Sequence, residues 1–203
     1  NTNTDINSGV NPDDTVTYLE RFKSESKDTA KQFSKLVTQS NMGRMKPVDS
    51  LNSEILNKLT RKSSLLGMNA NQVVLGMMSR PDIWQSIKML KIKTPKLKKE
   101  LGIEASRTHV AFTEIFTREG QYKLKDLVNN ANAMNPNQRG TFEKDIIKLD
   151  ERLNIAYMVY YGNLFKIFPR PADTHGHGAN DKWYNPMDAM NDFHEKDSKI
   201  IKM

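Results

Sequence analysis

Helical spacing of apolar residues is clearest between residues 141 and 162. The stretch reads TFEKDIIKLDERLNIAYMVYYG, and its apolar positions return every three or four residues over about six turns. Thr141 is a suitable N-cap and Gly162 a suitable stop. The pattern predicts one long amphipathic helix around which the other helices pack. Its apolar positions are Phe142, Ile146, Leu149, Leu153, Ala156, Tyr157 and Tyr160.

Four other segments carry shorter helical patterns, each with apolar residues on one face. Asp49 or Ser50 can cap the second of these helices, Asn69 can cap the third, and Pro81 ends it. Short helices are also predicted in PDIWQSI, PKLKKEL and WYNPMDAMNDF. The four longer helices are predicted over residues 14–34, 50–61, 70–79 and 122–133.

Turn residues and period-two alternation predict a small β component. Charged and apolar side chains alternate in KMLKIK and again in LFKIFP, and THVAF is a further candidate strand. Ser40-Asn41-Met42-Gly43 is turn chemistry, and Pro47 suits a strand end or edge because it has no N–H. The fold class is therefore mainly α with a small β component (α+β). Strands able to form a small sheet are predicted near residues 35–38, 44–47, 88–93 and 164–168.

Length and composition point to one globular domain with polar ends. The chain has 203 residues, of which 37% are hydrophobic and 27% charged. Residues 1–13 are predicted to be a flexible N-terminal segment, 14–194 a single domain and 195–203 a tail. No apolar run in the sequence approaches the ~20 residues that a membrane-spanning helix needs.

The charge balance favours an acidic partner. The net charge is +7, and KMLKIKTPKLKK, residues 88–99, holds six lysines. This stretch is either a solvated face or a surface attracted to anionic lipid headgroups, with Lys88, Lys91 and Lys93 as the candidate contacts. Nucleic acid is not an expected partner, because arginine is sparse here and no aromatic residues are interleaved for base stacking.

The sequence offers no recognisable catalytic residue. Cysteine is absent, which excludes disulfides and thiolate chemistry. His175 and His177 make a haem or metal contact conceivable, but they lack the i, i+4 spacing of helical zinc sites, so a mobile polar loop is the simpler interpretation. No metal site is therefore assigned. Asp150 lies beside the apolar stripe of the long helix and is expected to pair with Arg152 or a lysine.

Several stretches together carry a family resemblance. They are GRMKPVDSL with LNSEILNKLTRKSS after it, GMNANQVVLGMMSRPDIW, KLDERLNIAYMVYYGNLFKIFP and KWYNPMDA. This series, over about residues 32–203, resembles a soluble segment of the large bacterial system II cytochrome c synthases, cytochrome c biogenesis proteins in which ResB-like (CcsB) and CcsA-like halves are fused (CcsBA).

The resemblance implies a function for the parent protein. Synthases of this family move haem across the membrane and join it to the CxxCH motif of apocytochrome c. The segment would be an extracytoplasmic domain on the periplasmic face of the bacterial inner membrane, with residues 195–203 leading to a membrane helix. The implied partners are apocytochrome c and the transmembrane part of the same polypeptide.

The resemblance assigns the haem to the parent protein, and none is expected to be tightly bound to this segment. The family's tryptophan-rich haem signature is absent, because Trp84 and Trp183 stand far apart in different contexts. The segment is therefore expected to be non-catalytic, and to position apocytochrome c or support the haem site. The alternatives are a free-standing helical adaptor that binds a peptide or protein, and a metal-dependent enzyme.

The stretch GRMKPVDSL has both a structural and a functional interpretation. Gly43 suits a turn and Pro47 a strand end, and cations on an edge strand discourage unwanted pairing. The same cations, Arg44 and Lys46, are the first candidates for a surface that binds a partner.

Overall fold

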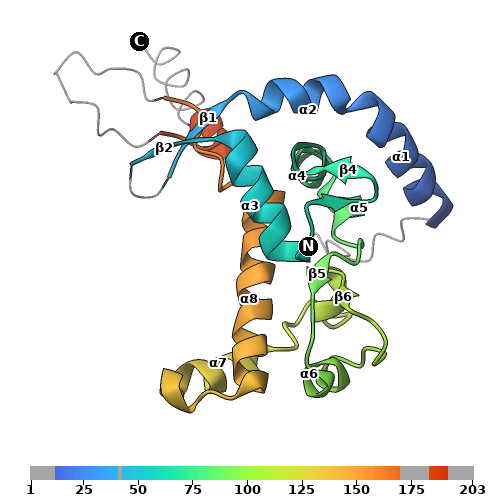
Figure 1. Ribbon diagram of the computed structural model, residues 1–203, viewed down its shortest axis with the longest axis vertical. Helices are drawn as coiled ribbons and strands as arrows, with labels where there is room; N and C mark the ends of the chain where they lie inside the picture. The colour runs from blue at the N-terminus through green and yellow to red at the C-terminus, as the bar shows by residue number, and fades with distance from the viewer. Residues whose placement is uncertain (1–11, 41–42, 170–182, 192–203) are drawn as a thin grey trace, which may run out of the picture.

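Helices dominate the computed structural model, which describes residues 12–40, 43–169 and 183–191 (Figure 1). In these residues the labelled helices are α1 (Pro12–Glu25), α2 (Lys27–Ser34), α3 (Val48–Thr60), α4 (Ala70–Ser79), α5 (Pro81–Trp84), α6 (Pro95–Glu100), α7 (Lys125–Ala133) and α8 (Thr141–Tyr160), with 3-10 helices η1 (Thr113–Ile115) and η2 (Pro136–Gln138). Residues 186–191 are also helical. The described strands form antiparallel pairs: β1 (Val37–Gln39) with β2 (Met45–Pro47), β3 (Ser64–Leu65) with β4 (Met68–Asn69), and β5 (Leu90–Lys91) with β6 (His109–Val110). The predicted mainly α fold with a small β component is confirmed.

The predicted long helix is present as α8, and part of the helical structure packs against it (Figure 1). Helices α3, α4, α6 and α7 pack against it, whereas α2 packs on α3 and α4 instead. One predicted core position, Tyr157, is half exposed and contacts Tyr161, with ring centroids 4.5 Å apart and the ring planes tilted by 42°. The buried positions of α8 include Ile146, Leu149, Leu153, Ala156, Val159 and Tyr160.

Trp84 joins the N-terminal helices to the rest of the core. The side chain is fully buried, and its indole meets Phe22 of α1 edge-on with ring centroids 6.2 Å apart. The backbone carbonyl of Trp84 accepts a hydrogen bond from the Tyr160 hydroxyl of α8 at 3.2 Å. Gly76 of α4 lies so close that an added Cβ would come 2.4 Å from Trp84 Cζ2. Gly76 therefore makes room for the indole.

Two predicted helices have different bounds in the structure. The helix predicted over 14–34 is divided at Ser26, whose buried hydroxyl accepts a hydrogen bond from Gln72 Nε2 at 3.0 Å. The helix predicted over 122–133 begins only at Lys125, because Tyr122 forms a β-bridge with Phe116. In both cases a contact with residues outside the helix accompanies the change in its bounds.

The predicted strands do not form one sheet. The stretch at 88–93 contributes only β5, which pairs with β6 from the THVAF stretch. The hairpin β1–β2 is joined to the 164–168 stretch, because the Gln39 N–H donates to the Lys166 carbonyl at 3.0 Å.

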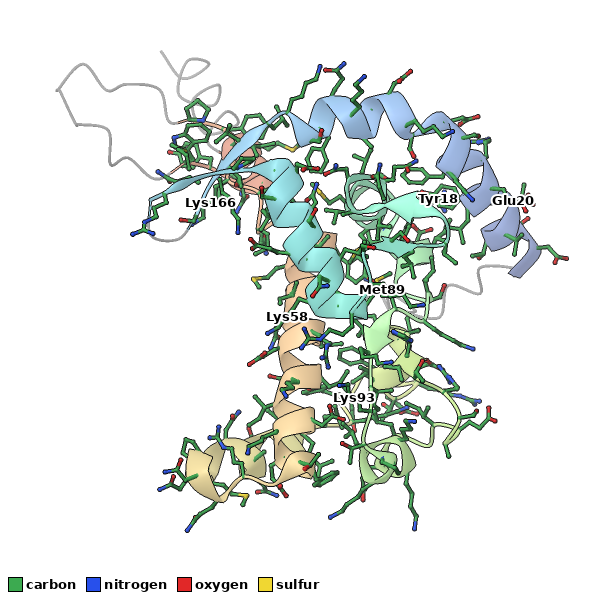
Figure 2. All side chains as sticks on the ribbon, in the orientation of Figure 1. Tyr18, Glu20, Lys58, Met89, Lys93 and Lys166 are labelled. Carbon is green, nitrogen blue, oxygen red and sulfur yellow. The ribbon has the colours of Figure 1, made fainter. Side chains whose placement is uncertain are left out.

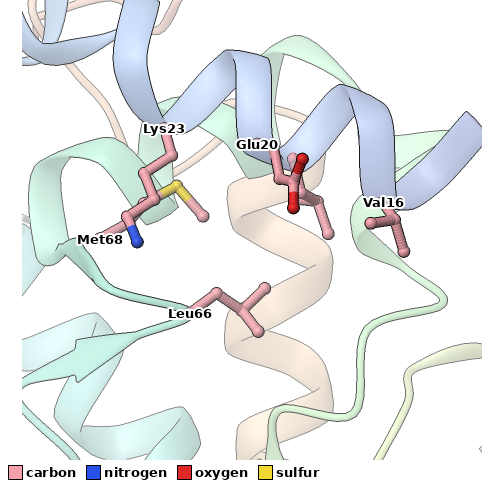
Figure 3. A pocket seen from close by; sticks show the side chains of 6 residues that line it. Val16, Glu20, Lys23, Leu66 and Met68 are labelled. Carbon is pink, nitrogen blue, oxygen red and sulfur yellow. The ribbon is translucent and has the colours of Figure 1, made fainter.

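The β3–β4 hairpin was not predicted from the sequence. Its two-residue turn has Leu66 at φ 55° and Gly67 at φ 73°, and glycine takes such a conformation without steric cost, whereas leucine rarely adopts it. A hollow of about 320 Å³ separates this hairpin from α1 (Figure 3). Val16, Leu66 and Met68 make most of its wall apolar.

No helix among the described residues is both long and apolar enough to span a membrane.

A bidentate ion pair between Arg107 and Glu114 connects the residues before and after β6. Arg107 Nη1 and Nη2 donate to the Glu114 carboxylate at 2.7 and 2.6 Å, and the Ala111 N–H donates to it at 2.7 Å. Burial opposes ionisation of Glu114, but these hydrogen bonds outweigh it and hold the pKa of the carboxyl below its ordinary value. Ionised Glu114 therefore stabilises the folded state.

We expect Glu114→Gln to weaken the acid dependence of stability. Because the folded-state pKa is the lower one, the contribution of Glu114 is present above the unfolded value of about 4.3 and is lost as the pH falls through the folded value. Urea unfolding at neutral pH and at stepped acidic pH should show a smaller loss of stability in this variant than in the wild type. Glu100→Gln, at an exposed carboxylate of α6, is the control. Equal acid dependence of Glu114→Gln and the wild type would contradict the expectation.

Candidate partner-binding surface

The β1–β2 hairpin presents an apolar face to solvent. Its register pairs Val37 with Pro47, Thr38 with Lys46 and Gln39 with Met45. Because faces alternate along a strand, Val37, Gln39, Met45 and Pro47 share one face, which we call the hairpin face, and Gln39 is its buried member. Val37 is 41% and Met45 49% exposed, whereas Thr38 on the opposite face is buried. The hairpin therefore carries its apolar residues outward.

One edge of the hairpin is covered and the other is open. The Gln39 N–H and the Thr38 hydroxyl both donate to the Lys166 carbonyl, at 3.0 and 3.3 Å, which covers the edge formed by β1. Among the residues that the structure describes, no segment pairs with the outer edge of β2. Pro47 lies on this edge and lacks an N–H, so Met45 supplies the edge's N–H donor.

Further apolar side chains are exposed at the same end of the molecule. The segment 183–191 is attached there, because the Trp183 N–H donates to Gln39 Oε1 at 2.8 Å and Tyr184 forms a β-bridge with Phe168. Figure 1 shows this end beside the hairpin, far from α6 and α7. Exposed fractions there are 43% for Phe168, 54% for Met187 and 57% for Met190. The apolar character thus extends beyond the hairpin face.

The two cations predicted on this stretch have different environments. Arg44 is exposed, next to the turn where Gly43 has φ 78°. Lys46 projects from the opposite face to Met45, is half-buried, and forms an ion pair with Glu54 of α3. Of the two, Arg44 is therefore the more accessible to a partner near the hairpin turn.

The other predicted cations lie in a separate region. Lys88 and Lys93 are exposed, and Lys91 is half-buried in β5. Figure 2 places Lys93 near α6, well away from the hairpin. The structure therefore does not bring these lysines together with Arg44 and Lys46 into one surface. Lys98 of the same stretch is buried and donates to the Ala105 carbonyl at 2.7 Å, so the lysine-rich stretch is not simply a solvated face.

His109 is packed between β6 and the end of α3. Its Nε2 lies 3.0 Å from the Thr60 carbonyl and its Nδ1 lies 2.9 Å from the Thr108 hydroxyl. Burial lowers the pKa of the imidazole against the effect of the Thr60 hydrogen bond, and nearby Lys91 lowers it further. The neutral ring therefore joins β6 to the end of α3.

Among the described residues Asp150 is hydrogen-bonded to Tyr122 and Asn154, instead of forming the expected pair with Arg152 or a lysine. The Tyr122 hydroxyl donates to Asp150 at 2.7 Å, and Asn154 Nδ2 donates to it at 3.2 Å. Burial and the carboxylate raise the pKa of Tyr122, so this phenol remains protonated. The pair links the segment before α7 to α8.

The histidines proposed for haem or metal contact, His175 and His177, lie outside the described residues. In the part of the chain that is described, no group of three or more histidines, aspartates or glutamates is arranged to hold a metal ion.

Comparison with known proteins relates the chain to one longer protein. The chain is 45% identical over 163 residues to Protein NrfI of Wolinella succinogenes. The match covers 80% of this chain and 18% of NrfI, so the chain spans less than a fifth of the length of that relative. No family model matches the chain. Identity at this level over 163 residues shows that the chain is homologous to a segment of NrfI.

Proposed function

We propose that this chain is a non-catalytic, extracytoplasmic domain of a membrane-bound cytochrome c biogenesis protein. The observation that carries the proposal is the 45% identity with NrfI, which supports a role in cytochrome c biogenesis. The resemblance of GRMKPVDSL and its companion stretches to fused ResB–CcsA synthases favours a position on the periplasmic face of the inner membrane. In this proposal haem is held by the parent protein, and the transmembrane part of the same polypeptide is a partner.

The hairpin face is the surface that we propose for apocytochrome c. The segment of apocytochrome c that carries the CxxCH motif must be accessible to haem. Its backbone groups and side chains are therefore free to contact another surface. Such an extended segment can lie against an exposed strand edge, where the main chain gives affinity and side-chain contacts give specificity. The edge of β2 and the exposed Met45 meet both requirements, and Arg44 adds a cation near the hairpin turn.

We expect Met45→Asp to weaken binding of a reduced CxxCH peptide about tenfold, equal to about 1.4 kcal/mol. The substitution places a charge in the centre of the hairpin face, and it should change the free energy of unfolding by less than about 0.5 kcal/mol because Met45 is half exposed. Isothermal titration calorimetry measures the affinity. The absence of cysteine from the chain prevents disulfide exchange with the peptide.

Leu66→Asp is the matched control for this experiment. Leu66 is 48% exposed at the tip of the β3–β4 hairpin, so its substitution makes the same charge change on a different apolar surface. Affinity should be retained in Leu66→Asp. Peptide binding that is absent from the wild type, or lost equally in both variants, would contradict a role of the hairpin face. A separate haem titration should give little binding.

A further inference from the structure

Six cationic side chains line one hollow between α3 and α8. The hollow has a volume of about 300 Å³, which is within the size range of small-molecule sites. Glu151 is the carboxylate among its described lining residues, and it already pairs with Lys58 at 2.8 Å. We call this hollow the α3–α8 cleft. Its cations are Lys58, Arg61, Arg139, Lys144, Lys148 and Arg152.

Three separate parts of the chain bring these cations together. The last turn of α3 and the residue after it supply Lys58 and Arg61, and Figure 2 shows Lys58 beside α8. Lys144 and Lys148 are four residues apart on α8, so they are neighbours on one side of the helix and repel one another. Arg139 follows η2. The concentration of positive charge is thus a product of the fold, not of one basic run.

The wall of the cleft contains buried guanidinium groups, one of which has a donor without an acceptor. Arg152 is 3% exposed, and its Nε and Nη1 donate to the Lys58 and Lys91 carbonyls at 3.0 and 2.9 Å. Arg139 Nη2 donates to the Asn132 carbonyl at 3.1 Å, while its Nε is buried and finds no partner in the described residues. Buried donors of this kind favour an added acceptor.

From this charge and these donors we propose that the α3–α8 cleft binds a small phosphate-type dianion. Guanidinium groups match the oxygen geometry of phosphate, and lysine ammonium groups add charge around it. Burial and neighbouring Arg61 lower the pKa of Arg152, and a bound dianion would relieve that repulsion. A hollow of about 300 Å³ admits a phosphate or diphosphate group but not a folded acidic surface. A soluble phosphate compound and an anionic lipid headgroup present this same chemistry.

Two probes test the proposal and distinguish the two sources. Inorganic pyrophosphate is titrated into the chain by calorimetry, and vesicles of phosphatidylglycerol are compared with vesicles of phosphatidylcholine by co-sedimentation. Binding should weaken at least tenfold in the double variant Lys144→Ala/Lys148→Ala, and it should weaken as salt is added. The control is Lys27→Ala/Lys31→Ala, which removes two exposed lysines at the same spacing on α2.

Each pattern of results decides the proposal. Pyrophosphate binding that is lost in the cleft variant and retained in the α2 variant supports a soluble ligand. The same pattern for phosphatidylglycerol vesicles alone supports a lipid headgroup. Equal losses in both variants would show only a general effect of net charge and would overturn the proposal. It would also be overturned if neither probe bound, or if an acidic peptide bound the cleft and the phosphate probes did not.

Discussion

Replacing Gly76 with alanine should destabilise the protein by about 3 kcal/mol, although alanine is the better helix former. Helix propensity alone favours the substitution by about 1 kcal/mol. The added Cβ, however, would lie 2.4–2.6 Å from Cζ2, Cε2 and Nε1 of Trp84, far inside van der Waals contact. The indole cannot retreat easily, because it is fully buried and packed against Phe22. Steric overlap therefore outweighs propensity.

A double-mutant cycle with Trp84→Phe tests this explanation. Phenylalanine lacks the indole atoms that the new Cβ would meet, so Gly76→Ala should cost much less in the Trp84→Phe background. Urea unfolding of the wild type, both single variants and the double variant gives the coupling energy. Additive effects of the two substitutions, or a stabilised Gly76→Ala variant, would show that the close approach is not the cause.

Helices with a strong apolar period could be predicted closely from the sequence. The pattern at 70–79 gives the bounds of α4, and Asn69 caps it as expected, accepting a hydrogen bond from the Gln72 N–H at 3.0 Å. The start of α3 is different. It begins at Val48 rather than after Asp49 or Ser50, because the Val48 N–H donates to the Leu36 carbonyl and continues the β1–β2 pairing. The sequence pattern thus predicts that α3 exists, whereas its first residue depends on the pairing with β1.

The strand at 88–93 illustrates why alternation is a weaker guide. Met89, Leu90 and Ile92 are all almost fully buried, so both faces of this segment meet the core. A two-residue strand such as β5 exists because β6 lies beside it, which no local pattern shows. The same limit applies to the β3–β4 hairpin, whose turn has a leucine at a position where glycine or asparagine is usual.

The candidate surfaces were only partly predictable for the same reason. The position of Arg44 near the hairpin turn follows from Gly43 and Pro47, but the ion pair that engages Lys46 depends on Glu54 of α3. The α3–α8 cleft collects residues that are up to 94 positions apart, as the Arg152–Lys58 hydrogen bond shows. The spacing of Lys144 and Lys148 was the available local signal.

Replacing Arg152 with alanine should destabilise the protein by about 4 kcal/mol. The side chain is 3% exposed and bridges two elements, since it donates to the Lys58 carbonyl at the end of α3 and to the Lys91 carbonyl of β5. Its removal leaves both carbonyls without these donors, at about 1–3 kcal/mol each, and leaves a cavity where the side chain lay. Lys148→Ala, at an exposed position one turn earlier on α8, should change stability by less than about 0.5 kcal/mol.

Arg152→Met separates the hydrogen bonds from the packing. Methionine keeps much of the side-chain volume, so the destabilisation of this variant comes mainly from the loss of the two hydrogen bonds to carbonyls. We expect urea unfolding to show a decrease of about 2–3 kcal/mol in the free energy of unfolding. Burial of the charged guanidinium has an opposing, unfavourable effect, which also lowers the pKa of Arg152. The apolar methionine side chain does not carry this unfavourable desolvation. If that cost were dominant, Arg152→Met would be as stable as the wild type or more so. A loss close to the expected value would instead show that Arg152 holds α3 and β5 against α8 through its hydrogen bonds.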